Sequence, residues 1–406
     1  MTFRTLPPAY SPLRFSSVVA AAGAVLRGPG PAHAALVEAL QDRLPPPGAR
    51  EVLLTDSGTS ALTLALRIGA ELHSDAPVAL PAYSCYDLAT AAVGADVRVS
   101  FYDVNPETLE PDLPSLRTAL ERGARTVVAV HLFGYPVAMP ALLGLAEEFG
   151  ALVIEDAAQA LGAEASERAA GSWGPLAVLS FGRGKGVTGG HGGALLLNDA
   201  GLRERTGAGR AQLPPPPPMA GRGLWDLLLV AALWALPRPV LYAIPARMPF
   251  LRLGETVYRE PHRALGMSGP AAAAARTSLE LAKREVAIRR GHARWLRERL
   301  LHHPALRLVQ ALDAPSACLR LPVVVQNGEA DHLARQGRNL GVARGYPMAL
   351  ADLPSLAARV SGDVSRMAGA RALARGLVTL PTHSLVPEPD RVRLVHWLWE
   401  GFAPTA

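Results

Sequence analysis

The stretch "TVVAVHLFGYPVAMPALLGLAEEFGALVIED", residues 126–156, decides the fold. It opens with a β-branched, apolar run of the kind found in buried strands. Residues 139–150 then carry apolar side chains at helical spacing and end at a glycine, and "ALVIED" (151–156) is again a strand. A strand, a helix and a strand in this order predict a crossover between two parallel strands.

The same alternation extends outward from this stretch. Further strands are predicted at 51–55, 76–81, 96–104, 176–181 and 193–198. Strands that alternate with helices predict an α/β fold whose mostly parallel sheet is covered on both faces. In such a sheet, ligands bind beyond the C-terminal ends of the strands.

The remaining chain suggests a three-part organisation. Residues 1–212 form the predicted large α/β domain, 213–265 a proline-rich arm ("LPPPPPM", 213–219) with a hydrophobic insertion, and 266–406 a smaller α+β domain. The smaller domain is predicted to open with a long helix capped by Ser268, to include a strand within "LRLPVVV" (319–325), and to close with a helix at 388–402.

The insertion at 224–251 is the most hydrophobic part of the chain. Its uninterrupted section, Trp225 to Leu236, is about 18 Å long as a helix, and a bilayer core of roughly 30 Å requires a longer one. Two interpretations stay open. One is peripheral contact with a membrane, which suits the arginines and aromatic residues of the segment, Arg238, Arg247, Arg252, Trp225, Trp234 and Tyr242. The other is a subunit interface or a cover over the sheet.

Composition narrows the class of protein. The formal charge of +6 arises from basic residues spread along the chain, which does not indicate a nucleic-acid partner. Two distant cysteines, Cys85 and Cys318, form no disulfide framework and favour a cytoplasmic location, with membrane association as the alternative. The histidines show no metal-ligand grouping, so no metal is expected. Residues 16–26 are interpreted as a first helix rather than a signal sequence.

Residues 57–62, "SGTSAL", follow the first predicted strand and open a helix. Free backbone N–H groups at a helix N-terminus make a seat for an anion such as phosphate, and the hydroxyls of Thr59 and Ser60 could add donors. An ordinary Ser/Thr helix cap would look the same in sequence.

The segment "VIEDAAQALGA" (153–163) ends a buried-type strand with two carboxylates, Glu155 and Asp156, and continues to Gln159. A buried carboxylate needs a cationic or hydrogen-bonding partner, and a protonated pyridine nitrogen is one such partner. The alternative is an exposed acidic pair at the start of a helix.

Lys185 lies in "SFGRGKGVTGGHGGALLL" (180–197), among glycines that would let a flat ring approach the backbone. Ser180, at the end of the preceding strand, could contact a phosphate. The alternative is a solvated lysine in a surface loop.

These three motifs resemble the DegT/DnrJ/EryC1/StrS aminotransferases, and the resemblance continues through 340–354 and 372–398. It covers nearly the whole chain apart from about 200–265. The resemblance implies an enzyme of the aspartate-aminotransferase fold (fold type I) that uses pyridoxal 5'-phosphate, acts as a homodimer and has a smaller C-terminal α+β domain.

By this resemblance Lys185 and Asp156 are catalytic. Lys185 would join covalently to the cofactor and shuttle a proton, and Asp156 would pair with the pyridine nitrogen. Gln159 would lie near the ring hydroxyl, and Gly58, Thr59, Ser60 and Ser180 would hold the phosphate. His131 matches a family position without a clear role and is interpreted as a core histidine.

The sequence departs from the family pattern at three places. Where an aromatic residue usually stacks on the ring, the chain reads "PAYSCYDL" (81–88), so that Tyr83, Cys85 or Tyr86 could face the ring; Tyr86 is the residue we assign to cofactor binding. His191 replaces a usual glutamate. "ALGM" (264–267) lacks the asparagine that reaches the neighbouring subunit's phosphate in the family.

The resulting functional prediction is transfer of an amino group from glutamate or a similar donor to a keto group. The acceptor is expected to be a sugar nucleotide or a related precursor of cell-surface or secondary-metabolite sugars. Two alternatives stay open: a sugar dehydratase, although that subgroup carries histidine where this chain has Lys185, and a non-catalytic cofactor-binding regulatory or scaffold protein attached to a membrane.

Overall fold

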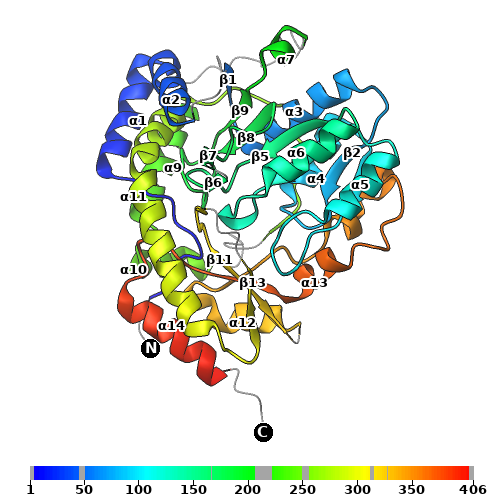
Figure 1. Cartoon of the computed structure of the whole chain (residues 1–406). Coiled ribbons are helices and arrows are strands. Elements are labelled where there is room, and N and C mark those ends of the chain that lie inside the picture. The colour runs from blue at the N-terminus through cyan, green and yellow to red at the C-terminus, as the bar shows by residue number, and fades with distance from the viewer. Residues whose placement is uncertain are drawn as a thin grey trace.

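The computed structural model describes residues 4–44, 51–165, 167–205, 222–248, 256–310, 315–326 and 328–401. A seven-stranded sheet forms the centre of the molecule, and helices cover it on both sides (Figure 1). Its strands are β1 (Glu51–Thr55), β2 (Val78–Pro81), β3 (Val99–Tyr102), β4 (Thr126–Val130), β5 (Leu152–Asp156), β8 (Leu176–Ser180) and β9 (Gly193–Leu197). All seven strands lie within or overlap the predicted strand segments.

The sheet order is β1-β9-β8-β5-β4-β2-β3. The pairs from β8 through β3 are parallel, whereas β9 runs antiparallel to both of its neighbours. The prediction of a mostly parallel sheet is therefore confirmed. The parallel order brings the C-terminal ends of β5 and β8 to one edge, where Asp156 and Ser180 are located.

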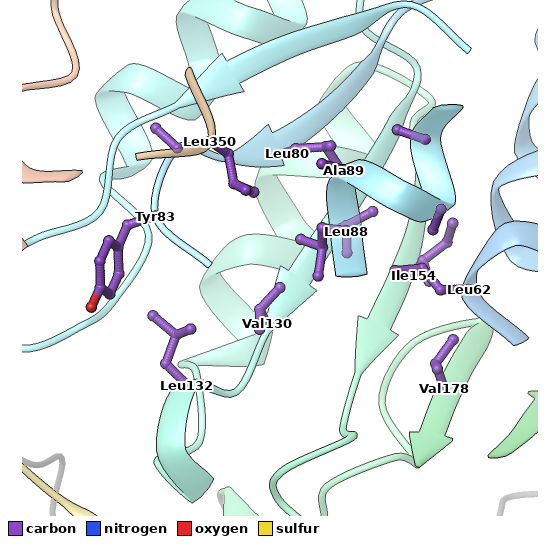
Figure 2. Packing of buried hydrophobic residues seen from close by; sticks show 14 of the residues in the cluster. Leu62, Leu80, Tyr83, Leu88, Ala89, Val130, Leu132, Ile154, Val178 and Leu350 are labelled. Carbon is purple, nitrogen blue, oxygen red and sulfur yellow. The ribbon is translucent and has the colours of Figure 1, made fainter. Parts of the chain in front are cut away.

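Both faces of this sheet are buried, as the near-continuous apolar strands require. In β8, Leu176 and Val178 belong to the core cluster on the side of α3 (Gly58–Leu72) and α4 (Asp87–Ala95). Ala177 and Leu179 belong to the cluster on the side of α2 (Pro29–Arg43) and α11 (Gly269–Leu300). Figure 2 shows Leu62 of α3 beside Ile154 and Val178. Helices α5 (Leu113–Glu121) and α6 (Met139–Glu148) pack on a further cluster that includes Val127 and Val153.

A second sheet, with the order β10-β11-β13-β12, lies in the C-terminal part of the chain. Its strands are β10 (Leu306–Leu308), β11 (Leu321–Val325), β12 (Ala343–Arg344) and β13 (Leu377–Leu380), and its helices are α12 (Ala330–Gln336), α13 (Ala368–Gly376) and α14 (Glu388–Gly401). The predicted smaller α+β region is thus confirmed. Leu350 and Leu373 nevertheless belong to the same core cluster as α3 and α4, so this region is packed onto the large sheet.

Helix α11 runs along one side of the molecule beside α1 (Phe15–Arg27) and α9 (Arg222–Ala235) (Figure 1). The Ser268 hydroxyl accepts a hydrogen bond from the Ala271 N–H, which confirms the predicted N-cap. Residues 16–26, interpreted as a first helix, lie within α1.

The hydrophobic insertion contains α9 and α10 (Pro239–Ala246), separated by Pro237. Among the described helices, none is both long and apolar enough to cross a bilayer. The proline run at 213–219, residues 249–251 with Arg252, and Phe402 lie outside the described residues. The division of the chain at 212 and 265 stays a prediction.

Smaller elements complete the described structure. They are α7 (Ala200–Arg205), the hairpin strands β6 (Glu164–Ala165) and β7 (Arg168–Ala169), and the 3₁₀ turns η1 (Leu132–Gly134), η3 (Gly337–Leu340), η4 (Leu350–Asp352) and η5 (Pro354–Arg359). They connect the helices and strands of the two sheets.

Leu195 tests the packing of the large sheet because it pairs with both Leu53 of β1 and Val178 of β8 and is fully buried. We expect Leu195→Ala to lower the free energy of unfolding by about 2–5 kcal/mol, since it removes core contacts and leaves a cavity. Leu301→Ala is the control, because that side chain is 63% exposed. Urea denaturation of both variants measures the difference, and equal losses would contradict this account of the core.

Candidate active site

The two carboxylates at the end of β5 are both buried, which rules out the alternative of an exposed acidic pair. Glu155 is surrounded by donors. Its Oε1 accepts hydrogen bonds from His131 Nε2 (2.9 Å) and the Gly171 N–H (2.6 Å), and its Oε2 accepts from the N–H groups of Trp173 (2.7 Å) and Gly174 (3.0 Å). Burial would raise the pKa of Glu155, but the hydrogen bond from His131, together with these N–H groups, holds the pKa below its ordinary value.

His131 is a core residue, as predicted, with 1% of its surface exposed. Its Nδ1 accepts a hydrogen bond from the Val137 N–H (3.0 Å), so the proton of a neutral ring is on Nε2 and is donated to Glu155. His131 and Glu155 therefore support the end of β5.

Asp156 is also buried, but it has far fewer donors. Its Oδ1 accepts one hydrogen bond from the Ala158 N–H (3.0 Å). Burial raises the pKa of Asp156 above its ordinary value, and the Ala158 bond and the charge of Lys185 counteract only part of this effect. A cationic partner for this carboxylate would offset the cost of its burial.

Lys185 lies in the connection between β8 and β9, within reach of the charge of Asp156. The backbone of this connection is held in place: the Gly189 N–H donates to the Phe181 carbonyl (2.9 Å), and the Ser11 hydroxyl donates to the carbonyl of Lys185 itself (2.6 Å). Gly184 has a φ of +71°, a conformation that favours glycine. Lys185 is half-buried and is one of only two lysines in the chain, the other being Lys283. A freely solvated loop lysine does not describe this arrangement.

The predicted helix start at residues 57–62 is the N-terminus of α3, and its use as an anion seat stays a prediction. Ser57 is the N-cap, and its hydroxyl accepts a hydrogen bond from the Ser60 N–H (3.0 Å). Gly58 and Ser180 are in contact: a Cβ added at Gly58 would lie 2.7 Å from the Ser180 Cβ. The structure thus brings Gly58, Thr59 and Ser180 together at the helix terminus, where backbone N–H groups attract anions. Ser60 lies behind them, buried, with its hydroxyl bonded to that of Ser57 (3.0 Å).

Three residues in "PAYSCYDL" could face a ring, and Cys85 is the one among them whose pKa is affected by the charge of Lys185. Burial and the nearby Asp87 raise the pKa of the Cys85 thiol to about 12, while Lys185 lowers it slightly. Tyr83 is fully buried, and its hydroxyl accepts from the Tyr346 N–H (3.0 Å). Tyr86 lies against the backbone of Met348. Assignment of Tyr86 to cofactor binding stays a prediction.

Tyr346 is a site residue that sequence reasoning missed. Gln159 Nε2 donates to the Tyr346 hydroxyl (2.8 Å), and the Tyr346 ring stacks on Phe133 with centroids 5.5 Å apart. A residue of the C-terminal region therefore fixes the side chain of Gln159 beside Asp156. The segment "LGVARGYPMALADLP" contained this tyrosine, but nothing in its spacing indicated the contact.

Three arginines lie around Tyr242 of α10. The charges of Arg338, Arg320 and Arg183 all act on Tyr242 of α10, and that of Arg320 also acts on Cys85 and Tyr346. Arg320 Nε is buried and makes no hydrogen bond within the described structure. This positive charge suits an anionic substrate.

The N-terminal segment also supports the site, and no sequence signal indicated it. Ser11 bonds to Lys185, the Ser278 hydroxyl donates to the Pro12 carbonyl (2.8 Å), and the buried Arg289 donates to the Tyr10 carbonyl (2.5 Å). These residues are far apart in sequence, and only the folded chain brings them together.

The sequence also departs from the family pattern at His191 and at residues 264–267, and both make defined contacts in the structure. His191 Nε2 lies 3.0 Å from Asp226 Oδ1 in α9, which ties the glycine-rich connection to the hydrophobic insertion. In "ALGM", the Leu265 N–H donates to Asp56 Oδ1 (3.2 Å) and the Leu265 carbonyl accepts from the Asp56 N–H (2.8 Å). This segment therefore lies against the start of α3.

A family model described as "DegT/DnrJ/EryC1/StrS aminotransferase family" matches residues 19–212, which contain the buried carboxylates, the anion seat and Lys185. In these residues, which make up slightly less than half of the chain, the protein is similar to that family. The match ends before the hydrophobic insertion.

Named members of this family align over part of the chain. A UDP-N-acetyl-3-dehydro-alpha-D-glucosamine 3-aminotransferase of Acidithiobacillus ferrooxidans is 33% identical over 150 residues, and a dTDP-3-amino-3,4,6-trideoxy-alpha-D-glucose transaminase of Streptomyces venezuelae is 39% identical over 153 residues. Each alignment covers 37% of this chain and 40% of the relative.

The fold likeness extends much farther than the sequence likeness. Spr1654 of Streptococcus pneumoniae, described as a sugar aminotransferase in its PLP form, superposes with a TM-score of 0.76 at 15% identity and covers 98% of both chains. The predicted fold class, that of the PLP-dependent transferases of fold type I, is confirmed by this likeness and by the sheet topology.

A substitution of Glu155 tests whether its hydrogen bonds stabilise the end of β5, where Asp156 is located. We expect Glu155→Gln to lower the free energy of unfolding at neutral pH by about 3–5 kcal/mol, because a buried ion loses its charge and an amide NH₂ meets N–H donors. Since the pKa of Glu155 is lowered in the folded state, its stabilisation is present above the unfolded value of 4.5 and is lost as the pH falls through the folded value.

The loss in the free energy of unfolding caused by Glu155→Gln should therefore be smaller at acid pH than at neutral pH. Urea denaturation at neutral pH and at about pH 4 measures this difference. Glu298→Gln is the control, since that side chain is 61% exposed. A penalty of the same size at both pH values would contradict the assigned charge of Glu155.

Proposed function

We propose that this chain is a pyridoxal 5'-phosphate-dependent aminotransferase that moves an amino group from glutamate or a similar donor to a keto group on a sugar nucleotide or related sugar precursor. The observation that carries the proposal is the convergence of Asp156, Lys185 and the N-terminus of α3 at one edge of the sheet. Similarity to the family and the sugar substrates named for the relatives support it.

The residues fit this cofactor at both of its charged ends. Asp156 is a buried carboxylate that lacks a cationic partner within hydrogen-bond distance among the described residues, and a protonated pyridine nitrogen would provide one. At the opposite end, Gly58, Thr59 and Ser180 present backbone and hydroxyl donors to a phosphate.

When bound, the cofactor supplies an electron sink for the carbon that gains or loses the amino group. The chain supplies the rest. Lys185 would hold the cofactor covalently through Nζ and would carry a proton to and from the substrate carbon. Asp156 would keep the ring nitrogen protonated, and Gln159, fixed by Tyr346, would orient the ring.

Recognition of an anionic acceptor is assigned to the arginines around Tyr242. Arg320 acts on Cys85, Tyr346 and Tyr242, and Arg183 acts on Tyr242. Phosphates of a sugar nucleotide, or the carboxylates of the donor, would complement this charge. A homodimer is part of the proposal as well, to be tested by light scattering of the purified protein.

Covalent attachment at Lys185 is tested by borohydride reduction of the cofactor-saturated protein and peptide mass mapping. We expect the label on Lys185 and none on Lys283, the only other lysine, which is exposed on α11. Lys185→Ala should lower the transamination rate by about 10²–10⁴-fold or more, and Lys283→Ala should leave it unchanged. A label on Lys283 alone, or on neither lysine, would refute the proposed chemistry.

The spectrum of the same material separates the aminotransferase from a non-catalytic binder. We expect the visible absorption band of the bound cofactor to shift when glutamate or another suitable amino donor is added. A band that no amino donor changes would favour the non-catalytic interpretation.

Gly193→Ala tests the phosphate seat. A Cβ at this position would lie 2.5 Å from both the Gly58 nitrogen and the Ser57 carbonyl oxygen, so the start of α3 would have to move. We expect a loss of stability of about 1–3 kcal/mol and a cofactor affinity at least tenfold lower, measured by equilibrium dialysis. Gly144→Ala in α6 is the matched control, because its added Cβ would meet no atom within 4 Å. Unchanged affinity in Gly193→Ala would place the phosphate elsewhere.

A further inference from the structure

Three helices, α1, α9 and α10, present large apolar side chains to solvent. Leu26 of α1 is 88% exposed, Trp225 of α9 is 68% exposed and Val240 of α10 is 58% exposed. Others on the same helices are Phe15, Val19, Val25, Leu224, Leu228, Leu241 and Ile244. Scattered apolar side chains are normal on a protein surface, but a contiguous group indicates an interaction site.

The exposed residues of α1 and α9 form one surface. The rings of Phe15 and Trp234 are 5.4 Å apart, and Ala21 and Val230 share a buried cluster with Ala274 of α11. These two contacts fix an antiparallel register between the helices, which places the end of α1 beside the start of α9. Both helices pack on α11 (Figure 1), and the side chains named above are the ones that they leave exposed to solvent.

Helix α10 extends this surface. Arg238 connects it to α9, because its Nη1 donates to the carbonyls of Trp234 and Ala235 (both 3.1 Å) and its guanidinium lies 4.9 Å from the Trp234 ring. The body of the protein holds both ends of α10: the Thr5 N–H donates to the Pro239 carbonyl, and Arg338 donates to the Ala246 carbonyl. The inner side of α10 carries Tyr242, near the site arginines, and the outer side carries the exposed residues.

The charge of this surface has one sign. On and at the ends of these helices, the exposed charged residues that the structure describes are Arg14, Arg27, Arg238 and Arg247. The three helices contain a single carboxylate, Asp226, which is buried and paired with His191. The surface therefore combines apolar and aromatic side chains with arginines and lacks an exposed acidic group on these helices.

This charge pattern decides between two occupants. A second copy related by a two-fold axis through the surface would bring the same arginines face to face, and the described side chains of the three helices offer no exposed carboxylate opposite them. An anionic bilayer complements both properties, since apolar side chains and tryptophan enter the interface while arginines bind lipid phosphates. We propose that α1, α9 and α10 form a docking surface for an anionic lipid bilayer, on which the three helices contact the lipid headgroups and upper acyl chains.

Co-sedimentation of the full chain with vesicles tests this docking surface. We expect binding to vesicles of phosphatidylcholine mixed with phosphatidylglycerol and little binding to phosphatidylcholine alone, with the binding weakened by salt. Leu228→Glu should reduce the partitioning by about tenfold or more, because it removes an apolar contact and adds a repelled charge.

Val392→Glu on α14 is the matched control, because Val392 is 50% exposed and Leu228 is 54% exposed, and both substitutions change the net charge equally. It should bind vesicles like the unaltered chain. Circular dichroism and the cofactor band of both variants check that fold and site are intact. No sedimentation with anionic vesicles, or equal binding by both variants, would overturn the proposal. So would a Leu228→Glu variant that lowers the oligomeric mass in light scattering and still binds vesicles, since a second copy would then cover the surface.

Discussion

The candidate site is organised around two adjacent carboxylates, Glu155 and Asp156, which differ in how many hydrogen bonds they receive from the protein. Alternation along β5 directs Glu155 and Asp156 to opposite sides of the sheet. Glu155 receives four hydrogen bonds, one from His131 and three from backbone N–H groups. Asp156 receives a single backbone bond from Ala158 and has a raised pKa. The first carboxylate is satisfied by hydrogen bonds from the protein, whereas the second has one such bond, and the proposed function assigns it a positively charged partner.

The surrounding elements fix the positions of Glu155 and Asp156 and bring other site residues to the same edge of the sheet. His131 and the 171–174 turn hold the end of β5 through Glu155, so the position of Asp156 does not depend on a bound ligand. The connection between β8 and β9 brings Lys185 to the same edge, and its backbone is anchored by the N-terminal segment through Ser11. Helix α3 aims its N-terminus at the region in front of Ser180. Together these contacts bring Asp156, Lys185 and the start of α3 to the same edge of the sheet.

Much of this arrangement could be predicted from the sequence, because the relevant patterns are short. Apolar strands alternating with helices predicted the seven strands, and the resemblance to the aminotransferase family implied Asp156, Gln159, Ser180 and Lys185 as site residues, which stays a prediction. Contacts between distant segments could not be predicted in this way. Tyr346 reaches Gln159 across 187 positions, and Asp226 of α9 reaches His191 in the β8–β9 connection. No periodicity encodes such pairs, since they depend on how the C-terminal sheet and α9 pack on the large sheet. Which of Tyr83, Cys85 and Tyr86 faces the site likewise depends on the backbone path after β2.

The scarcity of lysine has a consequence for the chemical selectivity of the protein. Aldehydes and ketones condense readily with primary amines, whereas a guanidinium is a poor nucleophile because its charge is delocalised and permanent. The chain has 41 basic residues, and only two of them are lysines. A reactive carbonyl compound therefore meets almost no competing side-chain amine on this protein, and one of the two amines that it can meet is the one in the β8–β9 connection. The arginine-rich composition limits unproductive adducts while it preserves the positive charge that attracts anionic molecules.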